Sequence, residues 1–204
     1  EKTEICEGYP EEVISAEFTN FAIHKYSFGK CTIEFRVEKQ RFESFLHPLL
    51  EYRETEEVGV GHSLFELFEY RDKIAFRLNG EIKGLWEYEE THRLIGFMYM
   101  CLINEIYHKE DDFWLMTVHA AALTNGRKTI LIPAESGSGK TTMAAMLQSK
   151  GFKLISDDFV PIDKDSRAWP FPIAMSVKEG AIDLISSIYP KLAEAPMTKT
   201  NAKK

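Results

Sequence analysis

The sequence predicts a mixed α/β fold, an α+β arrangement around a mixed sheet, and two features of the chain support this. The first half carries short runs rich in β-branched and aromatic residues, separated by turn residues. The second half alternates strand-like runs with helical segments and has a glycine-rich loop between one strand and one helix. We therefore expect a β-rich region with one buried helix at 1–112, which extends a second region at 113–204.

Two apolar runs open the first region, AEFTNFAIHKYSF and CTIEFRVEK. They flank Gly29-Lys30, which predicts two strands that meet at a turn. The segments LFELFEY, KIAFRLNG and EIKGLWEYEE then predict a meander, with Asn79-Gly80 as a hairpin signal because a type I′ turn needs positive φ at both central positions. RLIGFMYMCLINEIYHK has apolar residues at helical spacing, which indicates a buried helix.

The second region begins with WLMTVHAAALT and RKTILIPA, two apolar runs on either side of the hairpin signal Asn125-Gly126. TTMAAMLQSKG follows as a predicted helix with an apolar face of Met143, Met146 and Leu147, and Gly151 suits the position after its C-terminus. FKLIS and FVPID are predicted strands, and EGAIDLISSIYP is a predicted helix. The polar tail PMTKTNAKK predicts either a disordered end or a second region that is truncated here.

Composition limits the kinds of partner. The net charge is −7, which argues against nucleic acid, since that partner needs a basic face. No apolar run reaches the roughly 18 residues of a membrane-spanning helix, so we expect no membrane partner. Cys6, Cys31 and Cys101 are odd in number and widely spaced, which favours reduced thiols in a cytoplasmic protein.

The stretch ILIPAESGSGKTT fits the phosphate-loop pattern GxxxxGK[ST], with alanine in place of the first glycine. Such a loop wraps backbone N–H groups around phosphate oxygens, and the helix that follows adds positive partial charge. Lys140 would reach the β- and γ-phosphates of ATP, and the Thr141 hydroxyl would bind Mg²⁺. A plain surface turn is the alternative, which the flanking strand and helix disfavour. The candidate nucleotide-binding residues are Glu135, Ser136, Gly137, Ser138, Gly139, Lys140, Thr141 and Thr142.

Asp157 and Asp158 directly follow the predicted strand FKLIS, whose end can lie beside the loop in a parallel or mixed sheet. One carboxylate would hold Mg²⁺ and the other would accept the proton of an attacking hydroxyl. Thr141 and Asp157 are the candidate metal ligands, while the residues alone leave open which aspartate has which role. A solvated turn is the alternative for this pair.

His119 lies in the apolar run before the loop. In such a run a histidine is more often a core residue with its hydrogen bonds satisfied. Beside a phosphate loop it would donate to the γ-phosphate or tune the proton affinity of a carboxylate.

The order VHAAAL, Asn-Gly hairpin, ILIPAESGSGKTT, helix and GFKLISDDFVPI resembles the catalytic core of the bacterial HPr serine kinase/phosphorylase family and its relatives. That family shares its phosphate-loop core with phosphoenolpyruvate carboxykinases. The resemblance covers about residues 114–163, and it implies that His119, Lys140, Asp157 and Asp158 are the catalytic group. More loosely it includes PFPIAMSVKEG, which makes Lys178 a candidate for substrate or phosphate binding.

The leading hypothesis is therefore an ATP- and Mg²⁺-dependent kinase that phosphorylates a serine-type hydroxyl of a peptide or protein. Related small kinases act on precursor peptides or on free serine, so the acceptor stays open. The alternative is a non-catalytic nucleotide-binding scaffold or regulatory protein, and a carboxykinase-like enzyme ranks last. The expected partners are a nucleotide, the acceptor and, in a homo-oligomer, further copies of the chain.

Overall fold

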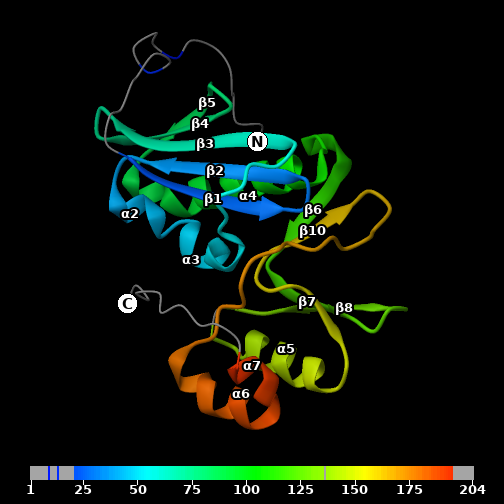
Figure 1. Ribbon diagram of the computed structural model, residues 1–204. Helices are drawn as coiled ribbons and strands as arrows, with labels where there is room; N and C mark the ends of the chain where they lie inside the picture. Colours follow the sequence, from blue (N-terminus) through cyan, green and yellow to red (C-terminus); the bar gives the residue numbers. More distant parts are fainter. Residues whose placement is uncertain (1–8, 10–12, 14–20, 136, 195–204) are drawn as a thin grey trace. The chain divides into compact units, whose positions relative to one another are not determined.

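The computed structural model describes residues 9, 13, 21–135 and 137–194, which belong to two compact units (Figure 1). The first unit ends at His108 and the second begins at Lys109, a few residues before the expected boundary at Asp112. The chain combines helices and strands, as predicted, and the sheet of the first unit is mixed, whereas the strand pairs of the second unit are antiparallel.

The first unit is built on a five-stranded sheet in the order β1-β2-β3-β4-β5. Its strands are β1 (Ala22–Phe28), β2 (Cys31–Val37), β3 (Gly61–Tyr70), β4 (Lys73–Leu78) and β5 (Glu81–Trp86). Strands β2 and β3 are parallel and the other neighbours are antiparallel. The predicted strand pair around Gly29 and the predicted meander are both confirmed, whereas the parallel pairing had no counterpart in the predictions.

A parallel pair needs a crossover, and residues 38–60 supply it. The crossover contains α2 (Gln40–Glu43), α3 (His47–Leu50) and the 3₁₀ helix η1 (Glu51–Arg53). Its last part is held beside β1, because Glu54 forms an antiparallel bridge with Tyr26 and the Thr55 N–H donates to the Lys25 carbonyl at 2.9 Å.

The turn between β4 and β5 has the backbone that its sequence predicts. Asn79 has a φ of 51° and Gly80 a φ of 86°, as a type I′ turn requires. The Asn79 side-chain oxygen also accepts the Leu64 N–H at 2.7 Å, which ties the turn to β3.

One long helix, α4 (Thr91–Tyr107), follows the 3₁₀ helix η2 (Tyr88–Glu90) and lies along the sheet (Figure 1). The Phe97 ring lies 6.2 Å from the ring of Phe76 and 5.7 Å from that of Trp86, so the helix packs on β4 and β5. Its buried residues are Leu94, Met98, Cys101, Leu102 and Ile103. The predicted buried helix is confirmed. Within the described residues, no helix combines the length and the apolar character needed to cross a bilayer.

The second unit contains a three-stranded sheet in the order β8-β7-β9 and a two-stranded ribbon of β10 and β6. Its elements are η3 (Asp111–Phe113), β6 (Trp114–Val118), β7 (Ala120–Thr124), β8 (Thr129–Pro133), α5 (Lys140–Ser149), β9 (Lys153–Ser156), β10 (Val160–Asp163), η4 (Glu179–Ala181), α6 (Ile182–Ile188) and α7 (Pro190–Ala193). The apolar run WLMTVHAAALT, which looked continuous, is divided at His119 into β6 and β7.

The central strand β7 is buried on both of its faces. Ala120 and Ala122 pack with Val160 of β10, while Ala121 and Leu123 pack with Ala144 of α5. The first three side chains of the strand are therefore methyl groups, and all three are fully buried.

The predicted apolar face of helix α5 is confirmed only at Leu147, which packs on Ala121, Leu123 and Ala144. Ala144 and Ala145 are fully buried, whereas Met143 and Met146 are about half exposed. Small side chains let the helix lie close to β7, where methionines would hold it away. The predicted role of Gly151 is confirmed: its φ is 91°, its N–H bonds the Gln148 carbonyl, and the next N–H bonds the Leu147 carbonyl, the two bonds of a Schellman motif.

Candidate functional site

The topology of the three-stranded sheet brings three separate segments of the chain to one edge. Strand β7 is antiparallel to both neighbours, with Ala120 opposite Pro133 of β8 and Ala122 opposite Ser156 of β9. The start of β7 therefore lies beside the ends of β8 and β9. His119 precedes β7, the glycine-rich loop follows β8 and Asp157 follows β9, so all three segments meet at this edge.

The glycine-rich loop turns back on itself before it enters α5. Gly137 and Gly139 have φ values of 89° and 93°, in the left-handed region that glycine adopts without strain. Both the N–H and the hydroxyl of Ser138 donate to the Glu135 carbonyl, at 3.2 and 2.6 Å. Glu135 thus acts here through its backbone, and Ser136 lies outside the described residues. The N-terminus of α5, with its positive partial charge, opens toward this loop.

Lys140 has its ammonium group buried beneath the loop, with only 5% of the side chain exposed. Its Nζ donates to the carbonyls of Ala134 at 2.7 Å and Glu135 at 3.2 Å, and to His119 Nε2 at 3.2 Å. The Asp158 Oδ1 lies 3.6 Å away. A buried ammonium needs such partners, and together they hold the positive charge at the start of the loop.

The contacts of His119 define its tautomer. Its Nδ1 lies 2.9 Å from the Asp158 carbonyl, which can only accept, so Nδ1 carries the proton. Its Nε2 faces the Lys140 ammonium, which can only donate, so Nε2 carries the lone pair. His119 is therefore held between the backbone of Asp158 and the Lys140 ammonium. It is not the buried core residue that the alternative reading of the sequence described, since its side chain is 58% exposed.

Asp157 is the buried member of the acidic pair. Its side chain accepts the Thr141 hydroxyl at 3.2 Å from Oδ2, and the Ser176 N–H at 3.1 Å. Burial, and secondly the neighbouring Asp158 carboxylate, raise the pKa of Asp157, and the contacts with Ser176, Thr141 and Lys140 oppose this only in part.

Asp158 is more open to solvent, with 39% of its side chain exposed. Its φ of 75° is in the left-handed region, which costs a non-glycine residue about 1–2 kcal/mol. Such strain persists where the surroundings fix the residue, and here the carbonyl is held by His119. The result is that the two adjacent carboxylates have different environments, one buried against Thr141 and one facing Lys140 and His119.

Five of the residues predicted from the sequence thus lie in one connected cluster: His119, Lys140, Thr141, Asp157 and Asp158. Thr142 is half-buried one position further along α5, and within the described residues no hydrogen bond joins its side chain to the cluster. Lys178 belongs near the loop, because a Cβ added at Gly137 would lie 3.2 Å from its Nζ.

Two backbone groups in the cluster escaped sequence reasoning. The Ser176 N–H donates to Asp157, and the Ala134 carbonyl accepts from Lys140. Ser176 and Ala134 take part only through their backbone, so the types of these two residues carry no signal for either contact. The contact between Ser176 and Asp157 forms only because the segment before Lys178 lies beside the end of β9 in the folded unit.

Comparisons of the chain with protein-family models, with curated proteins and with solved structures found no match. The donor set of the cluster itself fits a magnesium ion and a phosphate chain. The Asp157 carboxylate and the Thr141 hydroxyl are oxygen ligands of the type that Mg²⁺ takes. Lys140, the N-terminus of α5 and two glycines without side chains suit an anionic phosphate group.

Proposed function

We propose that this protein is an ATP- and Mg²⁺-dependent kinase that phosphorylates a serine-type hydroxyl of a peptide or protein, as the HPr-kinase-like resemblance implies. The observation that carries the proposal is the contact between the Thr141 hydroxyl and the buried carboxylate of Asp157. It joins the glycine-rich loop to the acidic pair, beside a buried lysine. A loop that only formed a surface turn would have no need for this arrangement.

The phosphate chain would be held by the loop amides and by Lys140. The ammonium of Lys140 has a fixed position, because the Ala134 and Glu135 carbonyls orient it. A preorganised positive charge in a buried place stabilises the charge that develops on the transferred phosphoryl group. Mg²⁺, when bound by Thr141 and Asp157, would neutralise charge on the phosphate oxygens.

Asp158 is our candidate for the general base, because its carboxylate is the more exposed of the pair and Asp157 already accepts the Thr141 hydroxyl. It would take the proton of the attacking hydroxyl while the new bond to the γ-phosphorus forms. The bond from that phosphorus to its bridging oxygen breaks, and ADP leaves. His119 would act as a positioning residue, since its N–H holds the Asp158 backbone.

The test is transfer of labelled phosphate from ATP to serine-containing peptides, to HPr and to free serine. Lys140→Ala and Asp158→Asn should both abolish transfer, and Asp158→Asn should still bind nucleotide. Asp112→Asn, which alters an exposed carboxylate in η3, is the matched control and should keep full activity. Normal transfer by both site variants would refute the proposal. Tight nucleotide binding without transfer to any acceptor would instead indicate a nucleotide-binding scaffold.

A further inference from the structure

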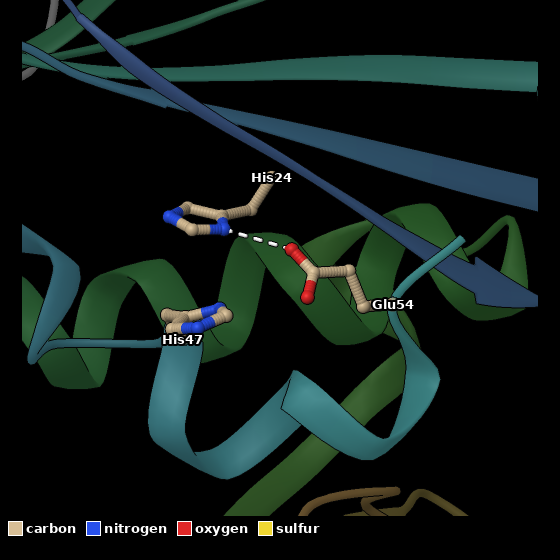
Figure 2. Close-up of side chains that lie close together, drawn as sticks. All are labelled: His24, His47 and Glu54. Carbon is tan, nitrogen blue, oxygen red and sulfur yellow. Dashed lines mark hydrogen bonds and ion pairs between the residues drawn. The ribbon is translucent and has the colours of Figure 1, made fainter. Parts of the chain in front are cut away.

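A second group of chemically active side chains lies in the first unit, where no motif of the sequence predicts a site. It consists of His24, His47 and Glu54 (Figure 2). One ligand atom from each of the three lies within 4.8 Å of the other two. The group is independent of the phosphate-loop cluster, since all three residues precede His108.

The chain fixes the three residues through its backbone. His24 lies on β1, and His47 is the first residue of α3. Glu54 follows η1 and is held opposite Tyr26 by a β-bridge. The backbone of all three residues is thus held by regular secondary structure or a β-bridge. Their proximity therefore does not depend on the conformation of a loop.

The imidazole of His24 has one satisfied nitrogen and one unsatisfied nitrogen. Its Nδ1 lies 2.9 Å from Glu54 Oε1. Its Nε2 is buried and has no hydrogen-bond partner among the described residues. Buried polar atoms of side chains nearly always have a partner, so an unsatisfied nitrogen on a ring that stacks on a second histidine calls for an explanation.

His47 is oriented by a neighbour in the way that metal-binding histidines are. The Tyr26 hydroxyl lies 3.0 Å from His47 Nδ1, and Tyr26 itself is fully buried. A histidine ligand usually has its second ring nitrogen held by such a group, which fixes the ring and leaves the other nitrogen for the metal. Burial, and secondly the nearby carboxylates of Glu54, Glu43 and Glu51, raise the pKa of the Tyr26 hydroxyl, so this group stays protonated beside the imidazole.

We propose that His24, His47 and Glu54 bind a divalent transition-metal cation, for which Zn²⁺ is the best match. Two imidazoles and one carboxylate are a ligand set that zinc takes in tetrahedral sites, with the fourth position open to water. Mg²⁺ and Ca²⁺ prefer all-oxygen sites, so they fit less well. The ion would tie β1 to the crossover that precedes β3.

The two rings must move for this binding. Figure 2 shows them one above the other, with the Glu54 carboxylate beside them, and their centroids are 3.9 Å apart at an interplanar angle of 26°. Imidazole lone pairs lie in the ring plane, so those of two stacked rings do not converge. One ring therefore turns about its side-chain bonds when the ion binds, and the stack opens.

The experiment is a titration of the full chain with Zn²⁺ by calorimetry, together with the visible spectrum of Co²⁺ in its place. It is made in a His119→Ala background, because His119 and Asp158 in the second unit also offer metal ligands. We expect one ion per chain and the intense spectrum of four-coordinate cobalt. His47→Ala and Glu54→Gln should abolish both signals. Tyr26→Phe should weaken affinity about tenfold, since loss of a supporting hydrogen bond costs roughly 10–100-fold.

His62→Ala is the matched control. His62 Nε2 also contacts a carboxylate, that of Glu34 at 3.1 Å, but the pair belongs to no three-residue group among the described residues. This variant should bind Zn²⁺ like the parent. Glu54 is 44% exposed, so Glu54→Gln should fold, which circular dichroism verifies. Absence of Zn²⁺ binding, or equal affinity in the folded Glu54→Gln variant, would overturn the proposal and leave the two histidines as a packing contact over Tyr26.

Discussion

The Thr141 hydroxyl lies 3.2 Å from the Oδ2 of Asp157. This contact joins the first turn of α5 to the end of β9, two elements of the second unit. If the Thr141 hydroxyl were removed, the Asp157 carboxylate would stay buried but would lose one of its hydrogen bonds. Leaving a buried polar group without its partner is costly, so the two oxygens depend on each other.

Thr141→Ala should therefore weaken Mg²⁺-dependent nucleotide binding. A hydrogen bond to a charged group contributes about 1.5–3 kcal/mol, which corresponds to roughly 10–100-fold in affinity. Thr141→Ser keeps the hydroxyl and should bind within a few-fold of the parent. Calorimetry with ATP, in the presence and absence of Mg²⁺, measures the difference. Equal affinities of the alanine and serine variants would contradict the role of the hydroxyl.

Stability should depend on pH through Asp157. Burial raises the pKa of this carboxyl in the folded protein above its value in the unfolded chain, about 3.9. The folded state thus gains stability from binding this proton. That stability is fully present below the pKa of the unfolded chain, and it is lost as pH rises through the pKa of the folded protein. Asp157→Asn stays neutral, so the variant should be more stable than the parent at neutral pH.

Urea unfolding at a series of pH values measures this effect. The parent should lose stability relative to Asp157→Asn across the window that starts near pH 3.9, about the unfolded value. Asp112→Asn, in an exposed position, should follow the parent. If the free energies of unfolding of the parent and of Asp157→Asn changed in parallel with pH, ionisation of the buried Asp157 carboxyl would not destabilise the folded protein.

Two glycine-to-alanine substitutions should act in opposite directions. At Gly151 the φ of 91° disfavours any side chain, although nothing lies within 4 Å of the new Cβ. Gly151→Ala should therefore destabilise the second unit by about 1–2 kcal/mol. Gly96 lies inside α4 with equally open space and no positive φ, so Gly96→Ala should stabilise the first unit by about 0.5–1 kcal/mol.

Chemical unfolding followed by circular dichroism gives both values. A new Cβ meets no atom within 4 Å at Gly96 or at Gly151, so neither substitution creates a steric clash. The two variants therefore compare the backbone conformations of the two positions. Destabilisation by the same amount in both variants would contradict the left-handed conformation assigned to Gly151.

Lys178 should contribute to nucleotide affinity, because its Nζ lies next to Gly137 of the loop. Lys178→Gln removes the charge and keeps most of the length, and we expect about a tenfold loss of ATP affinity, the effect of one charge-assisted hydrogen bond. Lys150→Gln, at the far end of α5, is the control and should bind normally. Unchanged affinity for Lys178→Gln would exclude a direct role.

Local chemistry explains which parts of the fold the sequence predicted. The turns at Gly29 and Asn79 and the C-terminal motif at Gly151 depend on the backbone preferences of single residues, so they are visible in the chain. The edge at which His119, Lys140 and Asp157 meet was expected of a parallel or mixed sheet, but it forms in an antiparallel one, because β7 lies between β8 and β9 and runs opposite to both. The parallel pairing of β2 with β3 could not, because it depends on a crossover whose short helices have little periodicity.

The misjudged features all depend on tertiary contacts. Met143 and Met146 looked like a core face, but the small side chains of β7 select the alanines of α5 instead. His24, His47 and Glu54 have no characteristic spacing, since a strand, a helix start and a bridge bring them together only in the folded unit. Periodicity within one segment cannot report which partner that segment meets.

The small side chains of β7 limit which substitutions this part of the fold can accept. Its first three side chains, Ala120, Ala121 and Ala122, have no reactive atom, yet the loop after β8 and the acid after β9 are spaced from each other by this strand. A bulkier residue there would spread the neighbours apart, and the separation would appear at the edge where chemistry is proposed. We therefore expect substitutions to be tolerated better in the exposed surroundings of the site than at these three methyl groups.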